Sequence, residues 1–492
     1  MNPATLVRRL GPDQAWPLFN VHQTRLIEQQ AQGELPGHTL MQRAGLATAQ
    51  LAVALTPHAQ TIWIACGPGN NGGDGLEAAI HLKQWGKRPV VTWLGTPELT
   101  PPDARQAWQG ACAAGVAFQA TPPAEFDLAI DALLGIGCQR MPDGPMAQWL
   151  ALMQASQTPV LCVDVPSGLL SDTGQWLKPN AAIACTSKRH TLSLLTLKPG
   201  LFTADGRDAA GEVWFSNLGI ERNLQPSAWL QAGTAAATPR QQNSHKGSYG
   251  DVMVIGGAPG MTGAAVLASE AALHGGAGRV LTCFLDATEH SSISAQHPAL
   301  MVRQVAQLDF KHATIVCGCG GGDAVRTELP RVLSTAARLV LDADALNAIA
   351  RDPSLQKLLK TRAAKDLPTV LTPHPLEAAR MLGCTVAQVQ MNRLEAAEEL
   401  ARQTLSVVVL KGSGSILAQT GRTSVINPTG NARLATAGTG DVLAGLLGAK
   451  LAHNNGAFLA SCEAVRMHGW VADTWDTTGP TFDAALLAAS VR

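Results

Sequence analysis

The sequence of 492 residues has no excess of charge of either sign, because lysine plus arginine and aspartate plus glutamate each total 37. Balanced charge gives no long-range field that would draw the chain to nucleic acid or to an anionic membrane surface. Charged residues make up 15% and hydrophobic residues 46%, which is typical of a globular chain and not of a disordered one. We therefore predict small-molecule substrates, with no nucleic-acid and no membrane partner.

Long apolar runs and clustered cysteines are also missing. No apolar stretch reaches the roughly 18 residues of a membrane span, and no apolar signal core follows Arg8 and Arg9. The ten cysteines include no CxxC pair and no ligand spacing with histidine, which predicts reduced thiols and a cytoplasmic protein. Cys317 and Cys319 form a close pair at the end of an apolar strand, and we interpret them as packing residues and not as a metal site.

What the sequence does contain is an alternation of short apolar runs with helical stretches, which is typical of βαβ units and parallel sheets. The chain is longer than a single hydrophobic core usually supports, so more than one domain is expected. Residues 221–244 are rich in Gln, Ala, Pro, Ser and Asn without apolar periodicity. We predict a domain at 1–222, a linker at 223–244 and a different α/β domain at 245–492. The predicted strands are 61–66, 89–94, 127–131, 159–164, 251–255, 279–284, 313–317, 338–341 and 406–410, and residues 38–55 are predicted to be helical.

In the first half, the strand at 61–66 leads into the glycine-rich loop GPGNNGGDG at 67–75, followed by a helix. This setting favours phosphate binding. The next strand lacks the terminal acidic residue that holds a ribose in dinucleotide dehydrogenases, which argues against ordinary hydride transfer. Asp131 and Asp164 each end a strand and precede a glycine turn. Because carboxyl ends of parallel strands gather along one edge, these motifs predict a ligand site there.

GPGNNGGDG, DALLGIG (131–137) and VDVPSGL (163–169) resemble, in this order, the YjeF-type NAD(P)H-hydrate epimerase family, and residues 40–45 and 197–200 extend the resemblance. It implies a Rossmann-like three-layer sandwich with Asp164 as the acid/base residue. It also implies a K⁺ ion held by Asn71, Asp131 and Ser167, whose oxygens suit a hard cation. The residues implied to bind the hydrated nucleotide, together with Asp164, are Asn70, Asn71, Gly72, Gly73, Asp74, Gly135, Ile136, Gly137, Cys138, Gln139, Arg140 and Met141.

In the second half, AGTGD at 437–441 leads directly into a helical stretch. The free amides of a helix start attract a phosphate or a developing anion, whereas Asp441 at the same place repels one. A carboxylate there can serve as a base for a reacting hydroxyl, or it can simply cap the helix. Lys411 in the glycine/serine turn 411–415 is a candidate phosphate contact, and His374 between two prolines indicates by itself only a stiff loop.

HKGSYGDVMVIGG (245–257), LDADALN (341–347), LTPHPLEAARML (371–382), VLKGSGS (409–415) and AGTGDVLAG (437–445) together resemble the ADP-dependent NAD(P)H-hydrate dehydratase family, whose fold is ribokinase-like. The resemblance implies ADP and Mg²⁺ as cofactors and Asp441 as the catalytic base. Residues implied to contact the nucleotide are Lys411, Gly412, Ser413, Gly414, Ser415 and Gly440, and those implied to contact the hydrate are Ala264, Gly320, His374 and Asp441.

As a whole, the chain resembles the bifunctional enzymes that epimerise R and S hydrates of NADH and NADPH and dehydrate the S form at the expense of ADP, giving AMP and phosphate. The loop GCGGGD at 318–323 departs from the GPGLG-like loop expected in that family. Two alternatives stay open: a small-molecule kinase of the same fold with a non-catalytic first domain, and a first domain that acts as a scaffold for RNA-decapping factors. We also expect a homo-oligomer.

Overall fold

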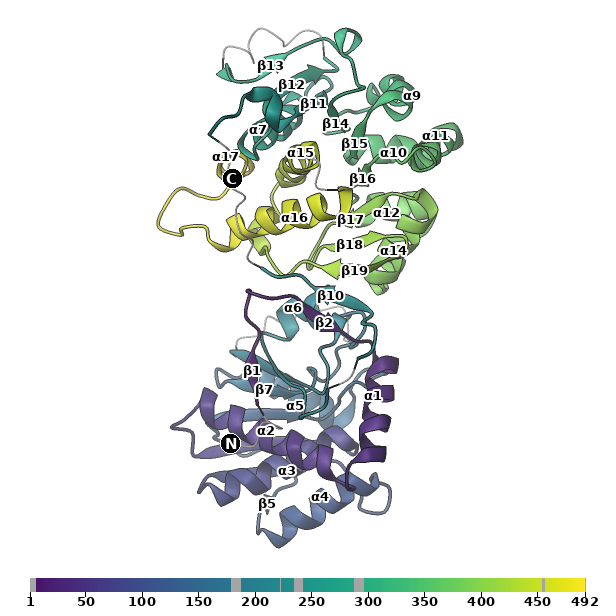
Figure 1. Ribbon diagram of the computed structural model, residues 1–492. Coiled ribbons are helices and arrows are strands. Elements are labelled where there is room, and N and C mark those ends of the chain that lie inside the picture. The colour runs from purple at the N-terminus through teal and green to yellow at the C-terminus, as the bar shows by residue number, and fades with distance from the viewer. Residues whose placement is uncertain are drawn as a thin grey trace. The chain divides into compact units, whose positions relative to one another are not determined.

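The computed structural model describes residues 6–177, 187–221, 223–233, 242–286, 296–453 and 456–491. Its chain forms two compact units, and Figure 1 draws them with their elements labelled. The first unit comprises residues up to 11 and 16–228, and the second comprises 12–15 and 229 onwards. The predicted linker at 223–244 spans this boundary and contains a short strand, β10 (Ala228–Leu230), with residues 234–241 outside the described part.

The first unit is built on one sheet of order β1-β9-β8-β7-β6-β3-β4-β5, in which β1 is antiparallel and the other strands are parallel. Its strands are β1 (Arg8–Arg9), β3 (Thr61–Cys66), β4 (Arg88–Trp93), β5 (Ala117–Phe118), β6 (Leu128–Ala132), β7 (Val160–Val163), β8 (Arg189–Leu194) and β9 (Glu212–Ser216). Its other elements are β2 (Trp16–Leu18), α1 (Val21–Glu34), α2 (Thr39–Leu55), α3 (Asn70–Gln84), α4 (Pro102–Ala113), α5 (Gly144–Ala155) and α6 (Gly206–Ala209).

Both faces of this sheet are covered by helices, as the alternation of side chains along β3 shows. Ile62 and Ile64 pack into a core with α2, α3 and α4, whereas Trp63 and Ala65 pack into a separate core with α5. Successive side chains of a strand point to opposite faces, so a strand buried on both sides reads as a continuous apolar run. The first unit is therefore the predicted three-layer α/β sandwich.

One edge of the first unit is fixed by a pair of stacked tryptophans. Trp93, at the end of β4, and Trp108, on α4, have ring centroids 5.5 Å apart and planes inclined by 22°. Such offset stacks add to the energy of simple area burial. The contact ties α4 to the end of the neighbouring strand.

The second unit has a sheet of order β13-β12-β11-β14-β15-β16-β17-β18-β19, with β10 beyond β19. Strands β13 to β17 are parallel, and β18 and β19 are antiparallel. Its strands are β11 (Asp251–Gly256), β12 (Arg279–Phe284), β13 (Met301–Val302), β14 (Thr314–Cys317), β15 (Arg338–Leu341), β16 (Thr369–Leu371), β17 (Val407–Leu410), β18 (Ile416–Gln419) and β19 (Arg422–Ile426). Its helices are α7 (Thr262–His274), α9 (Val325–Thr335), α10 (Ala343–Arg351), α11 (Pro353–Ala363), α12 (Pro375–Leu382), α13 (Val386–Met391), α14 (Arg393–Thr404), α15 (Thr439–Ala452), α16 (Ala457–Asp473) and α17 (Ala484–Ser490).

Helix α15 is the central helix of this unit, because most of its residues are buried and it packs on α7, α16 and the strands β11, β14 and β15. Gly445 permits this packing: a Cβ atom there would lie 1.9 Å from the carbonyl oxygen of Ala268 on α7. The buried position of the helix fixes its first turn at the carboxyl edge of the sheet, which is the edge where parallel α/β sheets bind ligands.

Candidate active sites

The first unit contains a cavity of about 430 Å³ at the carboxyl edge of its sheet. Eight of the predicted substrate-binding residues line it: Asn70, Asn71, Asp74, Gly135, Ile136, Gly137, Cys138 and Asp164. Gln139, Arg140 and Met141 are not among its lining residues, and neither are Gly72 and Gly73. Three predicted motifs therefore do meet at one edge, while the far end of the 135–141 segment lies away from the cavity.

The expected loop at residues 70–74 is instead the first turn of α3, which begins at Asn70. Its glycines allow close packing: a Cβ atom at Gly72 would lie 2.0 Å from the carbonyl oxygen of Gly67. Gly73 likewise packs against Met41 and Ala104. The helix is capped by Gly69, which offers no side-chain bond to the free amides. That first turn is thus open to an anion.

Asp164 is held in an unusual conformation at the mouth of this cavity. Its backbone φ is 67°, a left-handed value that few non-glycine residues adopt. Asp164 Oδ1 accepts a hydrogen bond of 3.0 Å from the amide of Leu194 and contacts the ammonium group of Lys198. Lys198 is itself fully buried and donates to the carbonyl of Leu194 at 2.7 Å. Backbone strain of this kind collects at functional sites, where the surrounding contacts impose it.

Asp74 and Glu28 also line this cavity, and sequence reasoning assigned no proton-transfer role to either. Burial raises the pKa of Asp74 well above its usual range, and the charge of Asp164 raises it further. Burial and Asp164 also raise the pKa of Glu28, which α1 places in the cavity wall. Carboxyl groups with raised pKa values beside an ion pair make a site suited to moving protons.

Asp131 and Ser167 form a buried polar pair behind the cavity. Ser167 donates to Asp131 through its hydroxyl at 2.6 Å and through its amide at 3.0 Å. Burial raises the pKa of Asp131, while these hydrogen bonds lower it. The side chain of Asn71 lies against Gly135, and its buried Nδ2 has no hydrogen-bond partner. The structure thus collects carboxylate, hydroxyl and amide oxygens near the turn that follows β6.

In the second unit, a charged cluster surrounds the start of α15. Lys411 Nζ donates to Asp342 Oδ1 at 2.6 Å, and the same oxygen accepts from Thr372 Oγ1 at 2.7 Å. A Cβ atom at Gly440 would lie 3.4 Å from Lys411 Nζ, so the ammonium group stands at the first turn of the helix. Gly438 caps this helix without a side-chain bond, which leaves the first amides open to an anion.

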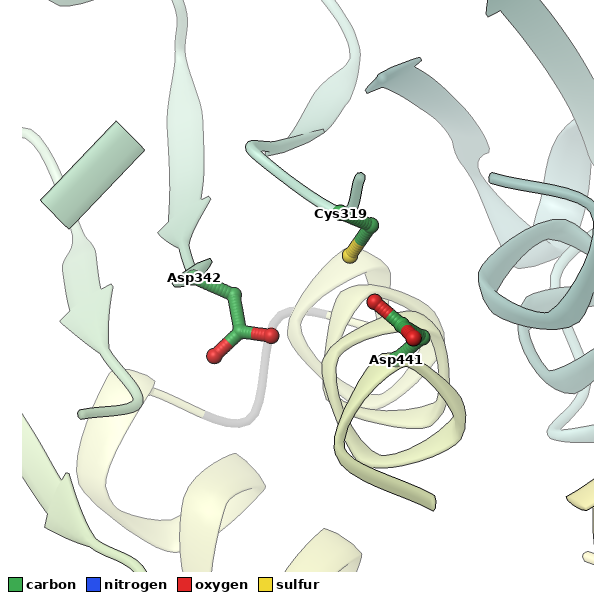
Figure 2. Close-up of side chains that lie close together, drawn as sticks. All are labelled: Cys319, Asp342 and Asp441. Atoms are coloured by element: carbon green, nitrogen blue, oxygen red, sulfur yellow. The ribbon is translucent and has the colours of Figure 1, made fainter. Parts of the chain in front are cut away.

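Asp441 shares this place with Asp342 and Cys319, as Figure 2 shows. Ligand atoms of the three side chains lie within 4.8 Å of one another. Burial and the charge of Asp342 raise the pKa of Asp441 to about 7, whereas a hydrogen bond with Cys319 and the charge of Lys411 lower it. A base with a pKa near neutrality can be deprotonated at working pH and still be strong enough to accept a proton.

Cys317 and Cys319 have different surroundings, although the sequence analysis treated both as packing residues. Both thiols are buried, and burial raises the pKa of each. Cys317 ends β14 inside the sheet, which fits the packing interpretation. Cys319 lies in the glycine-rich loop after β14, packs in the core and also contacts Asp441, so its role is not packing alone.

The remaining predicted residues of this half occupy neighbouring loops. Lys411 to Ser415 form the turn between β17 and β18, and Ala264 lies next to Gly320. His374 caps α12 and accepts from the amide of Leu376 at 3.1 Å. Burial and the charge of Lys411 lower the pKa of His374, so it stands on the Lys411 side of the cluster.

Several supporting residues escaped sequence reasoning. The buried guanidinium of Arg393 donates to the carbonyl of Lys411 at 3.2 Å and lies where a side chain at Gly412 would begin. His468 is 2.9 Å from the Thr439 carbonyl, and burial lowers its pKa to about 4, so it is neutral and donates there. Asp342 could have been found from the sequence, because it follows an apolar strand just as Asp131 and Asp164 do.

Fold and sites together describe a two-unit α/β enzyme, with a cavity lined by carboxyl groups in the first unit and a lysine–carboxylate cluster at a helix start in the second. Residues 37–200 match the family model described as YjeF-related protein N-terminus, and residues 252–490 match the one described as NAD(P)H-hydrate dehydratase. Among the described residues, no helix is both long and apolar enough to cross a membrane.

Curated relatives are similar to most of this chain. The bifunctional NAD(P)H-hydrate repair enzyme of Escherichia coli K12 is 34% identical over 461 residues, which cover 89% of this chain and 85% of that protein. The one from Vibrio cholerae is 35% identical, with 92% and 93% covered. The structure of a Bacillus subtilis ADP/ATP-dependent NAD(P)H-hydrate dehydratase co-crystallised with ATP and Mg²⁺ is 30% identical, with 51% of this chain and 91% of that chain covered and a TM-score of 0.45. The chain belongs to the family of bifunctional NAD(P)H-hydrate repair enzymes.

Proposed function

We propose that the first unit interconverts the R and S hydrates of NADH and NADPH, and that the second unit dehydrates the S form with ADP as phosphoryl donor. The observation that carries the second activity is Asp441 beside the Lys411–Asp342 pair at an uncapped helix start. The observation that carries the first is Asp164, held against Lys198 at the edge of a substrate-sized cavity. Both sites then serve one substrate.

For the first reaction, the hydrated ring carbon bears both a hydroxyl group and the ring nitrogen, so it is a hemiaminal. Asp164 takes the hydroxyl proton, and the carbon–nitrogen bond opens to give an aldehyde and a delocalised nitrogen anion. Rotation and closure on the other face reform the bond, and Asp164 returns the proton to the oxygen. Lys198 stabilises the carboxylate form of Asp164 before the first of these steps and after the last.

For the second reaction, Asp441 takes the proton of the ring hydroxyl, whose oxygen attacks the β-phosphorus of ADP, and AMP leaves. The amides around Gly440 and the ammonium group of Lys411 stabilise the transferring phosphoryl charge. The ring nitrogen then expels phosphate, and loss of a proton from the neighbouring carbon restores the double bond of NAD(P)H. Mg²⁺ carried by the nucleotide phosphates would neutralise part of their charge.

A K⁺ site in the first unit is part of this proposal. Asp131, Ser167 and Asn71 would hold the ion, because they offer carboxylate, hydroxyl and amide oxygens, the ligands that suit a hard cation. The ion would balance the buried Asp131 charge and fix the turn that lines the cavity.

We further propose a cytoplasmic location, supported by free thiols at the nine cysteines of the described ranges. The predicted homo-oligomer can be tested by light scattering.

The decisive experiment follows the recovery of NADH absorbance from a mixture of R and S hydrates with ADP and Mg²⁺. Complete recovery, faster than spontaneous epimerisation allows, is the expected result. Recovery that stops when the S hydrate is consumed would contradict the epimerase assignment alone. Phosphorylation of a vitamin-type alcohol without hydrate turnover would favour the alternative kinase.

A further inference from the structure

A second cavity, of about 300 Å³, adjoins the proposed epimerase pocket and has no role in the mechanism above. The two cavities share four lining residues: Gln32, Leu40, Asn70 and Asp103. Asp164 lines only the first cavity, so the reacting ring must lie there. The part of the substrate that does not react has to extend elsewhere, and the second cavity shares part of its wall with the first.

His38 gives the second cavity a specific polar anchor. Its side chain is 3% exposed, and its Nε2 lies 2.7 Å from Oε1 of the buried Glu77. Because that carboxylate accepts a hydrogen from Nε2, the other ring nitrogen, Nδ1, presents its lone pair to the cavity. Nδ1 is buried and has no hydrogen-bond partner. A buried acceptor left unsatisfied costs on the order of 1–3 kcal/mol, which a ligand donor would recover.

A second acceptor stands close to the first. Asp103 Oδ1 lies 3.9 Å from His38 Nδ1, which is too far for a hydrogen bond between them. A single ligand nitrogen can therefore lie within hydrogen-bond distance of both acceptors, and an amino group can donate one hydrogen to each of them. The rest of the wall is largely apolar, with Leu35, Pro36, Pro101 and Pro102 suited to the faces of a flat ring. These features fit a heterocycle that carries an exocyclic amine.

The first turn of α3 lies between the two cavities. Asn70, its first residue, lines both, and no side chain caps its free amides. Helix starts of this kind bind diphosphates in dinucleotide sites. The arrangement therefore offers three successive environments: an acid/base pocket, an anion site and an apolar pocket with two acceptors.

We infer that the second cavity binds the adenosine half of the hydrated dinucleotide, with the adenine amino group donating to His38 Nδ1 and Asp103. The inference rests on the proposed epimerase function and names a subsite for its substrate. It places the diphosphate at the start of α3 and makes His38 a specificity residue that takes no part in proton transfer.

The test compares three hydrates as epimerase substrates without ADP: that of NADH, that of its hypoxanthine analogue, and that of reduced nicotinamide mononucleotide. The hypoxanthine analogue carries a carbonyl oxygen in place of the amino group, and the mononucleotide lacks the adenosine half. The wild-type enzyme should show a KM lowest for the NADH hydrate and about tenfold higher for the analogue, with little change in kcat.

His38→Asn removes the ring acceptor with a residue that tolerates the left-handed backbone of position 38, where φ is 68°. The variant should raise KM for the NADH hydrate to that of the analogue and leave the mononucleotide hydrate unaffected. Equal changes for all three hydrates would overturn the subsite, because they would show a merely structural role. A wild-type enzyme that does not distinguish the three hydrates would also overturn it.

A pair of glycine variants avoids the buried histidine altogether. Gly37 lines the second cavity, and a Cβ atom there would meet nothing within 4 Å, so Gly37→Phe can fold and obstruct the cavity. Gly33→Phe is the matched control, because Gly33 is equally open but does not line either cavity. Only Gly37→Phe should raise KM for the dinucleotide hydrate relative to KM for the mononucleotide hydrate. The same change in both variants would contradict the proposal. If the wild type epimerises none of the hydrates, the epimerase function itself is wrong, and the subsite falls with it.

Discussion

Lys411 Nζ and Asp342 Oδ1 lie 2.6 Å apart, and the carboxylate is almost fully buried while the ammonium group stands at the first turn of α15. Thr372 donates to the same carboxylate oxygen. The pair therefore fixes the position of one positive charge at a helix start that already attracts anions. In our proposal, this charge contacts the phosphates of ADP.

Lys411→Met should abolish dehydration and also destabilise the second unit, because it leaves the Asp342 carboxylate buried without its partner. Breaking a buried ion pair on one side costs about 3–5 kcal/mol, which denaturant unfolding can measure. The double variant Lys411→Met with Asp342→Asn should regain most of that stability and none of the activity. Full dehydration activity in either variant would contradict the phosphate role of Lys411.

Asp441→Asn should retain ADP binding and lose dehydration of the S hydrate. The wild-type rate should rise with pH through about 7, because burial raises the pKa of Asp441 to about 7 and the base must be deprotonated. A raised carboxyl pKa lowers folding stability progressively from the unfolded value of 3.8 up to about 7. The melting temperature of the variant should therefore exceed that of the wild type by more at pH 8 than at pH 5. Calorimetry at the two pH values checks this sign.

Cys319→Ala should move the acid limb of the dehydration pH profile to higher pH. The hydrogen bond with the thiol lowers the pKa of Asp441, and the alanine variant loses it. Cys319→Ser keeps a donor and should leave the limb at or below its wild-type position. Cys317→Ala is the matched control, since Cys317 is equally buried in β14 but lies outside the three-residue cluster. An unchanged profile in Cys319→Ala would contradict the positioning role.

Asp164→Asn should stop epimerisation and leave dehydration intact. Asparagine tolerates the left-handed backbone at this position, so the fold should be kept, whereas Asp164→Val should also lower the melting temperature. With Asp164→Asn, recovery of NADH from mixed hydrates should slow to the spontaneous rate once the S form is consumed. A variant that epimerises at the wild-type rate would exclude Asp164 as the acid/base residue.

Replacing K⁺ by tetramethylammonium should slow epimerisation without affecting dehydration. The proposed ligands Asn71, Asp131 and Ser167 belong to the first unit, and no residue of the second site is involved. Asp131→Asn should epimerise slowly in either salt, because the charge that balances the ion is gone. Equal wild-type rates in the two salts would remove the ion from the proposal.

Secondary-structure elements that have a clear local sequence pattern were predicted well. The strands β3, β12 and β15 have the predicted bounds, because continuous apolar runs between turn residues leave little freedom. The strand β8 was missed because it is not a continuous apolar run: polar residues, His190 and Ser193 among them, are buried along it. The start of α3 was misjudged because its glycines, typical of a loop, serve close packing there.

The difference between local sequence patterns and tertiary packing also explains which site residues were recognised from the sequence. Strand-end acids and helix-start glycines predicted both candidate sites, since the topology of a parallel sheet brings the carboxyl ends of its strands together. Lys198, Glu28 and Cys319 were not recognised as site residues, because their positions depend on how a loop or a helix packs and not on any local pattern. Asp103, on α4, and His38, the residue before α2, come close to each other for the same reason.

The stacked pair of Trp93 and Trp108 gives the first unit an optical signature of its own. Two indoles held in contact couple their electronic transitions, which splits the far-ultraviolet circular dichroism into a couplet that unstacked indoles do not produce. Because α4 carries both Trp108 and the acid at position 103, loss of the couplet during heating would report when that helix leaves the sheet. Melting of the two halves of this chain could then be followed separately in one intact molecule.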